Sequence, residues 1–120
     1  HAVIEVNKIR FVRALVNLIE NAFYAVDKQS GRIGLSAAYS NQEQEHYIIL
    51  RVEDNGRGIP QDVMQQIWES GFSTRSSHGL GLSFVKQVVT SSGGTIHMES
   101  RADEGTDVTI VLPEGKETDE

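Results

Sequence analysis

Residues 8–27 read KIRFVRALVNLIENAFYAVD, and apolar side chains recur in this stretch at every third or fourth position. The positions concerned are Phe11, Leu15, Leu18, Ala22 and Val26. Residues three and four apart lie on the same side of a helix, so this spacing is typical of a helix that buries one face. The stretch predicts a first helix from about Lys8 to Asp27.

The same helix carries a second stripe, which is polar and mostly uncharged at its centre. Its members are Arg13, Asn17, Asn21, Tyr24 and Lys28. Asparagine is a poorer helix former than alanine, so two of them in mid-helix cost stability and suggest a compensating function. A solvated helix face explains the spacing as well, and the stripe alone leaves both interpretations open.

The composition limits the classes of protein to be considered. A chain of 120 residues with 38% hydrophobic and 23% charged content fits one globular domain. Its net charge of -6 argues against a general surface for nucleic acid or for anionic membranes. The chain has no cysteine, no stretch of about 20 apolar residues and no signal-peptide pattern. We therefore expect a cytoplasmic domain or the cytoplasmic part of something larger.

Four strands are predicted after the first helix. Segments 32–39 and 46–53 alternate apolar with polar or small residues and read as a hairpin around a polar loop. Segments 95–100 and 107–113 alternate in the same way and are joined by the turn RADEG. We expect the domain to cover residues 1–113, with residues 114–120 as a disordered tail.

Proline and glycine mark two further helices. Pro60 suits the first position of a short helix that runs to about Trp68, because its missing N–H is not needed there. A third helix is expected from about Gly81 to Ser92, before Gly93-Gly94. The order of elements predicts an α+β fold, a two-layer α/β sandwich with about three helices on one face of a mixed, mostly antiparallel sheet.

The stretch VEDNGRGIP, residues 52–60, is a second candidate for a site. Gly56 and Gly58 permit backbone conformations and close approaches that a side chain would block. Asp54, beside that opening, could accept a hydrogen bond from an exocyclic amino group and would discriminate against a carbonyl there. An ordinary Asp-Asn-Gly turn explains the same residues about as well.

A third candidate is WESGFSTRSSHGLGLSFVKQVV, residues 68–89. Its first half has little apolar surface to fix a loop, so it could act as a lid. Gly79 and Gly81 lead into a helix whose first N–H groups are unpaired and suit a phosphate, and Arg75 or His78 could add positive charge. A lone GLGL is weak support, and by itself favours a plain helix start.

The candidates occur together, in order and spacing, with a further motif at the end of the chain. The motifs are NLIENA (17–22), DNGRGIP (54–60), GFSTR (71–75), HGLGLSFVKQVV (78–89) and GTDVTIVLP (105–113). From about Asn7 to Pro113 they resemble the ATP-binding catalytic domain of bacterial sensor histidine kinases. That family shares the Bergerat fold with gyrase, the Hsp90-type chaperones and MutL, so the resemblance implies this fold.

The resemblance implies roles for residues on the magnesium side of the site. Asn21 would ligate the Mg²⁺ that bridges the ATP phosphates, and Asn17, one turn earlier, would face the same site. Tyr24 stands where many members carry lysine or arginine, so Arg75 or Lys28 would be the nearby cation.

On the base side, the resemblance implies that Asp54 accepts from the adenine amino group. Gly56 and Gly58 would let the base lie against the backbone, Ile59 would cover it and Thr106 would help to hold it.

Residues 70–77 would form the ATP lid. The remaining residues implied in nucleotide binding are Ser73, Thr74, His78, Gly79, Leu80, Gly81 and Leu82. Ser77 stands where many members have glycine, so the hinge of the lid is expected to be stiffer or differently placed.

The implied function is to bind Mg-ATP and to donate its γ-phosphoryl group to a histidine of a two-component sensor kinase. The acceptor would lie on a separate dimerisation and phosphoacceptor domain, with a response regulator as the indirect partner. None of His1, His46, His78 and His97 has the sequence context of such an acceptor. No nucleic acid or direct membrane contact is expected.

Three alternatives remain open at this stage. The gyrase and MutL branch hydrolyses ATP with a glutamate where this chain has Asn17, which cannot take a proton from water. Glu20 would be a poorer base, because it lies about 60° around the helix from Asn17. An anti-sigma-type serine protein kinase and a non-catalytic ATP-binding regulatory module share the fold.

Overall fold

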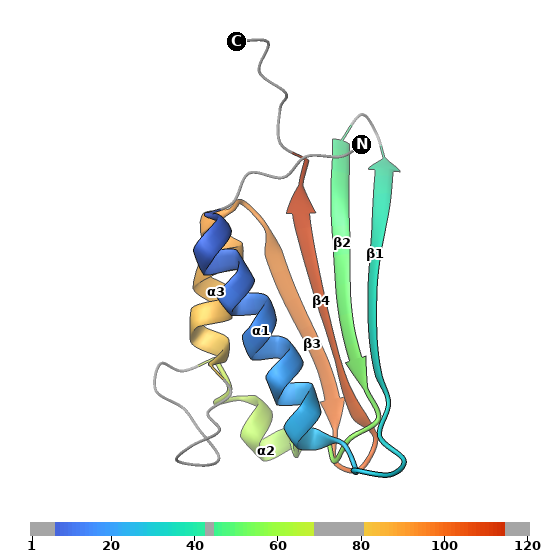
Figure 1. Cartoon of the computed structure of the whole chain (residues 1–120). Helices are drawn as coiled ribbons and strands as arrows, with labels where there is room; N and C mark the ends of the chain where they lie inside the picture. The colour runs from blue at the N-terminus through green and yellow to red at the C-terminus, as the bar shows by residue number, and fades with distance from the viewer. Residues whose placement is uncertain (1–6, 43–44, 69–80, 115–120) are drawn as a thin grey trace.

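The computed structural model of the chain describes residues 7–42, 45–68 and 81–114, which form two layers (Figure 1). The sheet consists of β1 (Ile33–Gln42), β2 (Glu45–Asp54), β3 (Thr95–Arg101) and β4 (Gly105–Pro113). The helices are α1 (Lys8–Ala25), α2 (Gln61–Met64) and α3 (Leu82–Ser91). The described helices all lie on one face of the sheet (Figure 1), so the predicted two-layer α+β sandwich is confirmed.

The strand order is β1-β2-β4-β3, and every neighbouring pair of described strands is antiparallel. The sequence had allowed a mixed sheet. The register pairs Asp54 of β2 with Thr106 of β4, and Thr106 with Ser100 of β3. Three polar residues from distant parts of the chain therefore form a row across one end of the sheet.

The first helix begins where its sequence predicts. The side chain of Asn7 accepts a hydrogen bond from the Arg10 N–H at 3.1 Å, which pairs one of the free donors of the first turn. The helix ends at Ala25, two residues earlier than predicted, because Val26 is extended. Asp27 then accepts from the N–H of Gln29 at 2.8 Å and closes a turn toward β1.

The core lies between α1, α3 and the central strands. Its buried apolar residues are Phe11, Ala14, Leu18, Ala22, Val52, Ile67, Leu82, Val85, Val88, Val89, Val108, Ile110 and Leu112. The predicted apolar stripe of α1 is therefore confirmed in its centre, but Leu15 and Val26 are only partly buried. Burial of this kind is the main stabilising contribution in a domain of this size.

The hairpin and the short helix also have boundaries that differ from the sequence prediction. The hairpin strands continue to Gln42 and Glu45, where a loop was expected, and the rings of Tyr39 and His46 stack with centroids 5.8 Å apart. Such cross-strand pairs stabilise a strand that has no apolar alternation. The short helix ends at Met64 and continues as a turn, which buries Ile67 in the core.

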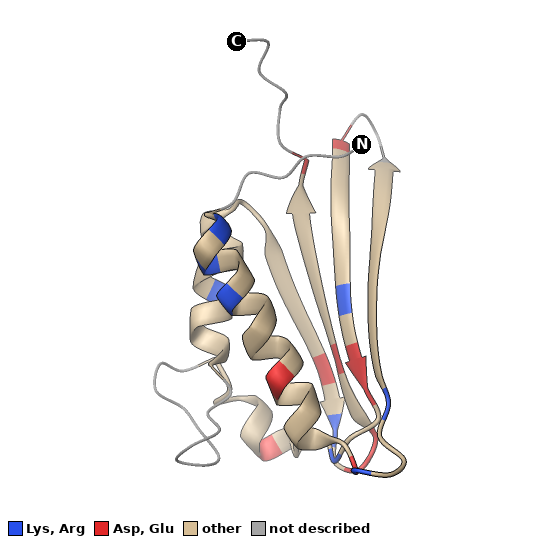
Figure 2. Ribbon diagram, in the orientation of Figure 1, with Lys and Arg blue, Asp and Glu red and all other residues tan. Residues whose placement is uncertain are grey.

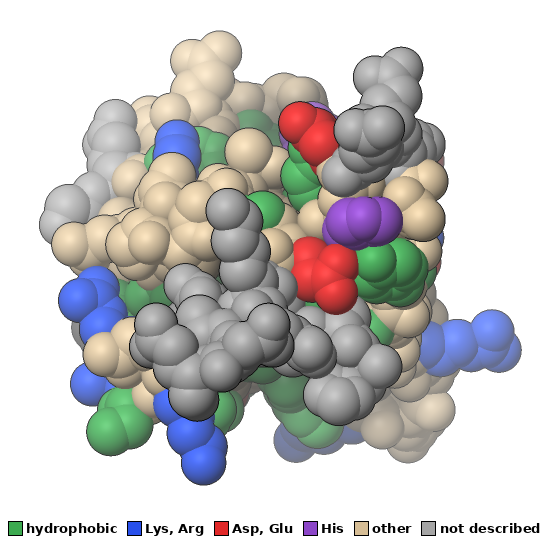
Figure 3. Space-filling model, turned by 90° about the horizontal axis from the view of Figure 1, so that it is seen from above, with side chains coloured by type: hydrophobic (Ala, Val, Ile, Leu, Met, Phe, Trp, Pro, Cys, Tyr) green, Lys and Arg blue, Asp and Glu red, His purple; other side chains and the backbone are tan. Residues whose placement is uncertain are grey.

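Charge is unevenly distributed over the two layers. Lys8, Arg10, Arg13 and Lys86 lie on the first half of α1 and on α3, where no described residue is acidic (Figure 2). Seen from above, several basic side chains project at the left and bottom of the view, and acidic and histidine side chains gather together at the right (Figure 3). A chain with a net charge of -6 thus has a basic region on its helices.

The end of the chain contains an ordered contact beyond β4. Pro113 is the last residue of β4, and the Glu114 N–H donates to the His46 carbonyl at 2.9 Å. The predicted tail otherwise lies outside the described residues, as do residues 1–6. No helix in the described ranges is long and apolar enough to cross a membrane.

We predict that Ile110→Ala lowers the free energy of unfolding by about 2 to 5 kcal/mol, because it leaves a cavity in the centre of the core. Ile110 is 2% exposed, whereas Ile9 on α1 is 73% exposed. The matched control Ile9→Ala should change stability by less than about 0.5 kcal/mol. Urea unfolding followed by circular dichroism measures both, and equal losses would contradict this account of the core.

Candidate functional site

A cavity of about 340 Å³ opens between α1, the loop after β2 and the sheet. Its walls are mainly apolar and come from Leu18, Ala22, Ala25, Val52, Ile59, Pro60, Val63, Leu82, Met98 and Val108. Side chains able to hydrogen-bond are few: Asn21, Tyr24, Asp54, Arg57 and Thr106. An apolar cavity with a few placed polar groups is the usual form of a site for a small molecule.

The cavity brings together predicted site residues from both ends of the chain. Those in its lining are Asn21, Tyr24, Asp54, Gly58, Ile59, Leu82 and Thr106. Asn21 and Tyr24 project from α1, whereas Asp54 and Thr106 stand at the ends of paired strands. The magnesium and base sides inferred from sequence are thus parts of one concave surface.

Asp54 is the carboxylate of this cavity. Its Oδ1 accepts from the Gly56 N–H at 2.8 Å. The N–H groups of Gly56 and Thr106 both act to lower its pKa. Burial raises the pKa of Asp54, and the two N–H donors only partly offset that rise. The group is therefore oriented by the backbone but poorly solvated, a state in which a ligand's hydrogen-bond donor would be favourable.

The loop after Asp54 is held on both sides by backbone hydrogen bonds. The Arg57 N–H donates to the Ala25 carbonyl of α1 at 3.0 Å, and the Asp103 N–H donates to the Arg57 carbonyl at 2.6 Å. The Ile59 N–H donates to the Ser100 hydroxyl at 2.8 Å. The loop is thus fixed between the end of α1 and the β3–β4 turn before any ligand binds.

The two glycines of this loop have different roles. Gly58 lines the cavity with φ +65°, and a Cβ there would lie 1.8 Å from the Arg101 carbonyl oxygen. Gly56 does not line the cavity; its Cβ would lie 2.5 Å from the Ala25 carbonyl oxygen. Gly58 therefore shapes the cavity directly, whereas Gly56 lets the loop approach α1 and holds Asp54.

Asn17 and Gly81 meet beside the cavity. Gly81 precedes α3 with φ +62°, and a Cβ there would lie 2.6 Å from Nδ2 of Asn17. Neither residue is in the cavity lining. The structure therefore places Asn17 against the start of α3, one turn from Asn21.

Several predicted residues lie outside the described part of the chain. They are Ser73, Thr74, Arg75, His78, Gly79 and Leu80, within the undescribed range 69–80. The lid inferred from sequence and its arginine thus remain predictions.

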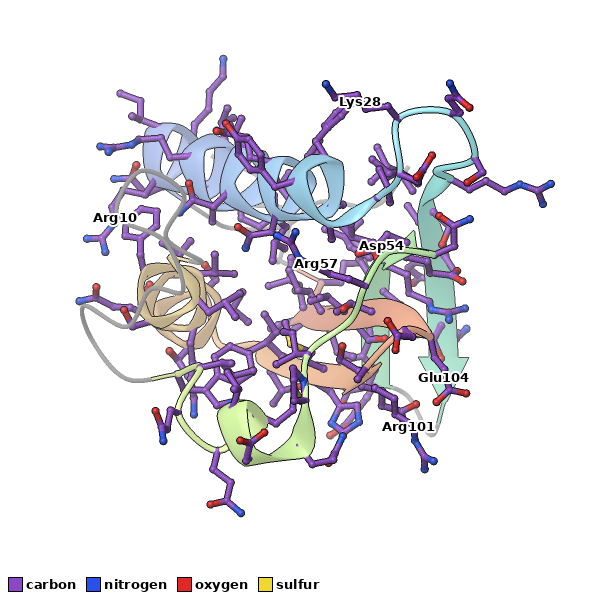
Figure 4. All side chains as sticks on the ribbon, turned by 90° about the horizontal axis from the view of Figure 1, so that it is seen from below. Arg10, Lys28, Asp54, Arg57, Arg101 and Glu104 are labelled. Atoms are coloured by element: carbon purple, nitrogen blue, oxygen red, sulfur yellow. The ribbon has the colours of Figure 1, made fainter. Side chains whose placement is uncertain are left out.

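Two residues that the sequence analysis did not select belong to the site. Arg57, a residue of the loop, lines the cavity, and its side chain lies near α1 and Asp54, whereas Lys28 projects outward (Figure 4). Ser100 lies beneath the loop and bonds Ile59. Arg57 stands inside the quoted motif DNGRGIP, but Ser100 has no local signal, because its partners are distant in sequence.

A larger hollow of about 660 Å³ adjoins the first one and shares Asp54, Met98 and Thr106 with it. Its other walls include four carboxylates, on Glu53, Glu99, Glu104 and Asp107. The cationic side chains in these walls are Arg101 and, when its ring is protonated, His97. Such a surface repels phosphates. The smaller, more apolar cavity is therefore the better candidate for a nucleotide.

Comparisons with known proteins show which family the chain resembles. The model of the family described as histidine kinase-, DNA gyrase B-, and HSP90-like ATPase matches residues 6–116. A probable C4-dicarboxylate sensor kinase of Bacillus subtilis (strain 168) is 36% identical over 104 residues, which are 82% of this chain and 19% of that protein. Sensor histidine kinase YclK of the same organism is 32% identical over 94% of this chain and 24% of its own.

Solved structures of histidine kinases have the same fold. The nucleotide-free catalytic domain of histidine kinase ThkA superposes with a TM-score of 0.74 at 26% identity, over 92% of this chain and 70% of that one. The mycobacterial sensor histidine kinase MprB superposes with a TM-score of 0.74 at 30% identity, over 90% of this chain and 72% of that one. The chain thus spans most of these domains but less than a quarter of the two full-length relatives.

We predict that Gly58→Ala destabilises the domain by more than about 2 kcal/mol, from left-handed strain and the overlap with the Arg101 carbonyl. Gly34 on β1 has no atom nearer than 4.0 Å to the same added carbon. The control Gly34→Ala should leave stability unchanged or raise it by up to about 1 kcal/mol. Chemical denaturation tests both, and a stable Gly58→Ala protein would refute the described loop conformation.

The raised pKa of Asp54 predicts that Asp54→Asn stabilises the ligand-free domain at pH 7. Below the unfolded-state pKa of 3.8, the Asp54 carboxyl is protonated in the folded protein, and this form contributes to the stability of the domain. That contribution is lost as pH rises through the higher folded-state pKa. The melting temperature of the variant should therefore exceed that of the unmodified domain at pH 7, and the difference should shrink below pH 3.8.

Asp27 provides a control of opposite sign. The N–H groups of Gln29 and Ser30 lower the pKa of Asp27, so Asp27→Asn should reduce the melting temperature at pH 7. If both variants melted below the unmodified domain at pH 7, the inferred burial of Asp54 would be wrong.

Proposed function

The chain belongs to the histidine kinase-, DNA gyrase B-, and HSP90-like ATPase family, as an ATP-binding catalytic domain of the sensor histidine kinase type, and we propose that its cavity binds Mg-ATP for transfer of the γ-phosphoryl group to a histidine. The acceptor histidine would lie on a separate dimerisation and phosphoacceptor domain. A response regulator would then be the indirect partner.

The observation that supports this proposal best is the pairing of a carboxylate with a glycine-lined apolar cavity. Asp54 can only accept hydrogen bonds when ionised, so it suits the amino group of adenine and opposes a carbonyl. Gly58, Ile59 and Val63 lie in the same wall. The residues present therefore fit the base of ATP.

The phosphate side is supported by the distribution of charge. The acidic groups cluster near the strand ends beside Asp54, and the basic residues lie on the first half of α1 and on α3 (Figure 2). A nucleotide with its base against Asp54 and its phosphates toward Asn21 would point its charge at the basic half. Arg57, at the cavity wall, is a further cation for the site.

Asn21 is the residue proposed to hold Mg²⁺. Its amide oxygen is a hard ligand of the kind that Mg²⁺ takes, and it lies in the cavity wall. Within the described ranges, no group of three or more histidine, aspartate or glutamate side chains could form a metal cage. The other ligands would therefore be phosphate oxygens and water, and the ion would neutralise charge on the phosphates.

In the proposed reaction, the bond between the γ-phosphorus and its bridging oxygen breaks, a phosphorus–nitrogen bond forms on the acceptor imidazole, and ADP leaves. The described histidines of this chain do not face the cavity. His46 stacks on Tyr39, and His97 lies 3.3 Å from Glu99 beside the acidic hollow. An acceptor from another domain is consistent with this arrangement.

Transfer is favoured over hydrolysis by the residue one turn before Asn21. Asn17 carries an amide, which cannot act as a general base toward water, and it packs against the start of α3. Glu20 is exposed and does not line the cavity. We therefore expect slow ATP hydrolysis by the domain alone.

We further propose that residues 70–77 close over the phosphates as a lid that includes Ser73, Thr74 and Arg75. His78, Gly79, Leu80 and Gly81 would complete the phosphate side. A cytoplasmic location is proposed with the rest, because ATP and response regulators would be available there.

Asn21→Ala should abolish magnesium-dependent ATP binding and leave the fold intact, because it removes the proposed metal ligand from a wall position. The matched control is Asn41→Ala, which changes an exposed asparagine on β1 far from the cavity. Isothermal titration calorimetry with ATP, in magnesium and in EDTA, measures the effect. An Asn21→Ala domain with unchanged affinity for Mg-ATP would refute this role.

A further inference from the structure

Ser100 occupies an unusual position beneath the cavity. Its side chain is 6% exposed, and among the residues that the structure describes it is the one buried polar residue. It lies opposite Thr106 in the sheet, in the same row as Asp54. Ser100 does not line the nucleotide cavity, but Thr106 does.

The Ser100 hydroxyl has three polar neighbours. It accepts from the Ile59 N–H at 2.8 Å, lies 3.1 Å from the Gly105 carbonyl oxygen and lies 2.7 Å from the Thr106 hydroxyl. A serine hydroxyl has one hydrogen to donate and two lone pairs that accept. The direction of the contact with Thr106 therefore depends on where that single hydrogen goes.

Two arrangements are possible. If Ser100 donates to the Gly105 carbonyl, Thr106 donates to Ser100, and all three short contacts are hydrogen bonds. If Ser100 donates to Thr106, its contact with the Gly105 carbonyl has no hydrogen, and only two bonds form. In a buried position each lost bond is costly, so the first arrangement is favoured.

In the favoured arrangement the only hydroxyl hydrogen of Thr106 is engaged by Ser100. Thr106 then presents lone pairs to the cavity and acts there only as an acceptor. Asp54 beside it is also an acceptor, because an ionised carboxylate has no hydrogen to donate. Both polar groups at this end of the cavity thus seek donors from the ligand.

We propose that Ser100 is a positioning residue that fixes Thr106 as an acceptor and so strengthens selection for a purine with an amino group at position 6. This inference rests on the proposed function and adds a source of base specificity outside the cavity lining. The carbonyl oxygen of a 6-oxopurine would meet two acceptors where the amino group of adenine offers donors.

Ser100→Ala keeps the backbone support of Ser100 but also removes the acceptor of the Ile59 N–H, so the test compares the ratio of two nucleotide affinities and not one affinity alone. The Gln61 side-chain amide donates to the Ser100 carbonyl at 2.8 Å, and β3 stays paired with β4 through the backbone. In the variant, the Thr106 hydroxyl can rotate and donate to a ligand carbonyl. The change should therefore relax specificity more than it alters the sheet.

The experiment compares dissociation constants for Mg-ATP and for magnesium inosine triphosphate, which carries a carbonyl at position 6. In the unmodified domain ATP should bind more tightly. Ser100→Ala should reduce the ATP preference by roughly 3- to 10-fold, the effect of one hydrogen bond. The control Ser36→Ala, at an exposed serine of β1, should leave the preference unchanged.

Thr106→Val separates positioning from simple structural support. It should reduce the preference by itself, and Ser100→Ala should then reduce it no further, because Ser100 acts through the missing hydroxyl. If Ser100→Ala weakened both nucleotides equally, or lowered the preference in the Thr106→Val background, the inference would be overturned. If the unmodified domain did not prefer ATP, the proposed function itself would fail.

Discussion

The loop of residues 55–59 is confined between the end of α1 and the β3–β4 turn, and the site depends on that confinement. Hydrogen bonds to Ala25, Ser100 and Asp103 fix its backbone on both sides. The space left is too small for a side chain at Gly58. Hydrogen bonds join α1, the loop and the β3–β4 turn there. The cavity groups on the helix, the loop and the sheet are therefore held in place without a ligand.

The same arrangement lowers the stability of the empty domain, because it buries part of the Asp54 carboxylate. A half-buried carboxylate with a raised pKa is unfavourable in the empty protein at neutral pH. A ligand that donates to it offsets the cost and adds its binding free energy to the folded state. The site thus favours binding over the stability of the empty domain, as is common where a function needs a strained or poorly solvated group.

Much of the fold could be predicted from local patterns. Helical periodicity predicted α1, glycines marked the end of α3, and strand alternation with the RADEG turn predicted β3 and β4. The errors lie where the pattern is weak. The hairpin continues through polar residues because cross-strand partners support it, and the short helix stops at Met64, where the chain turns and Ile67 is buried in the core. Propensity is least informative where such tertiary contacts decide.

By itself the sequence indicated the order of the elements and, through its motifs and the family that they resemble, the polar residues of the cavity except Arg57. Only the tertiary structure decided how these residues are used. It distinguished Gly58, in the cavity wall, from Gly56, which supports it. It also brought Ser100 beside Ile59 and Thr106. The reason is that strand register, a property of the whole sheet, sets which distant residues become neighbours.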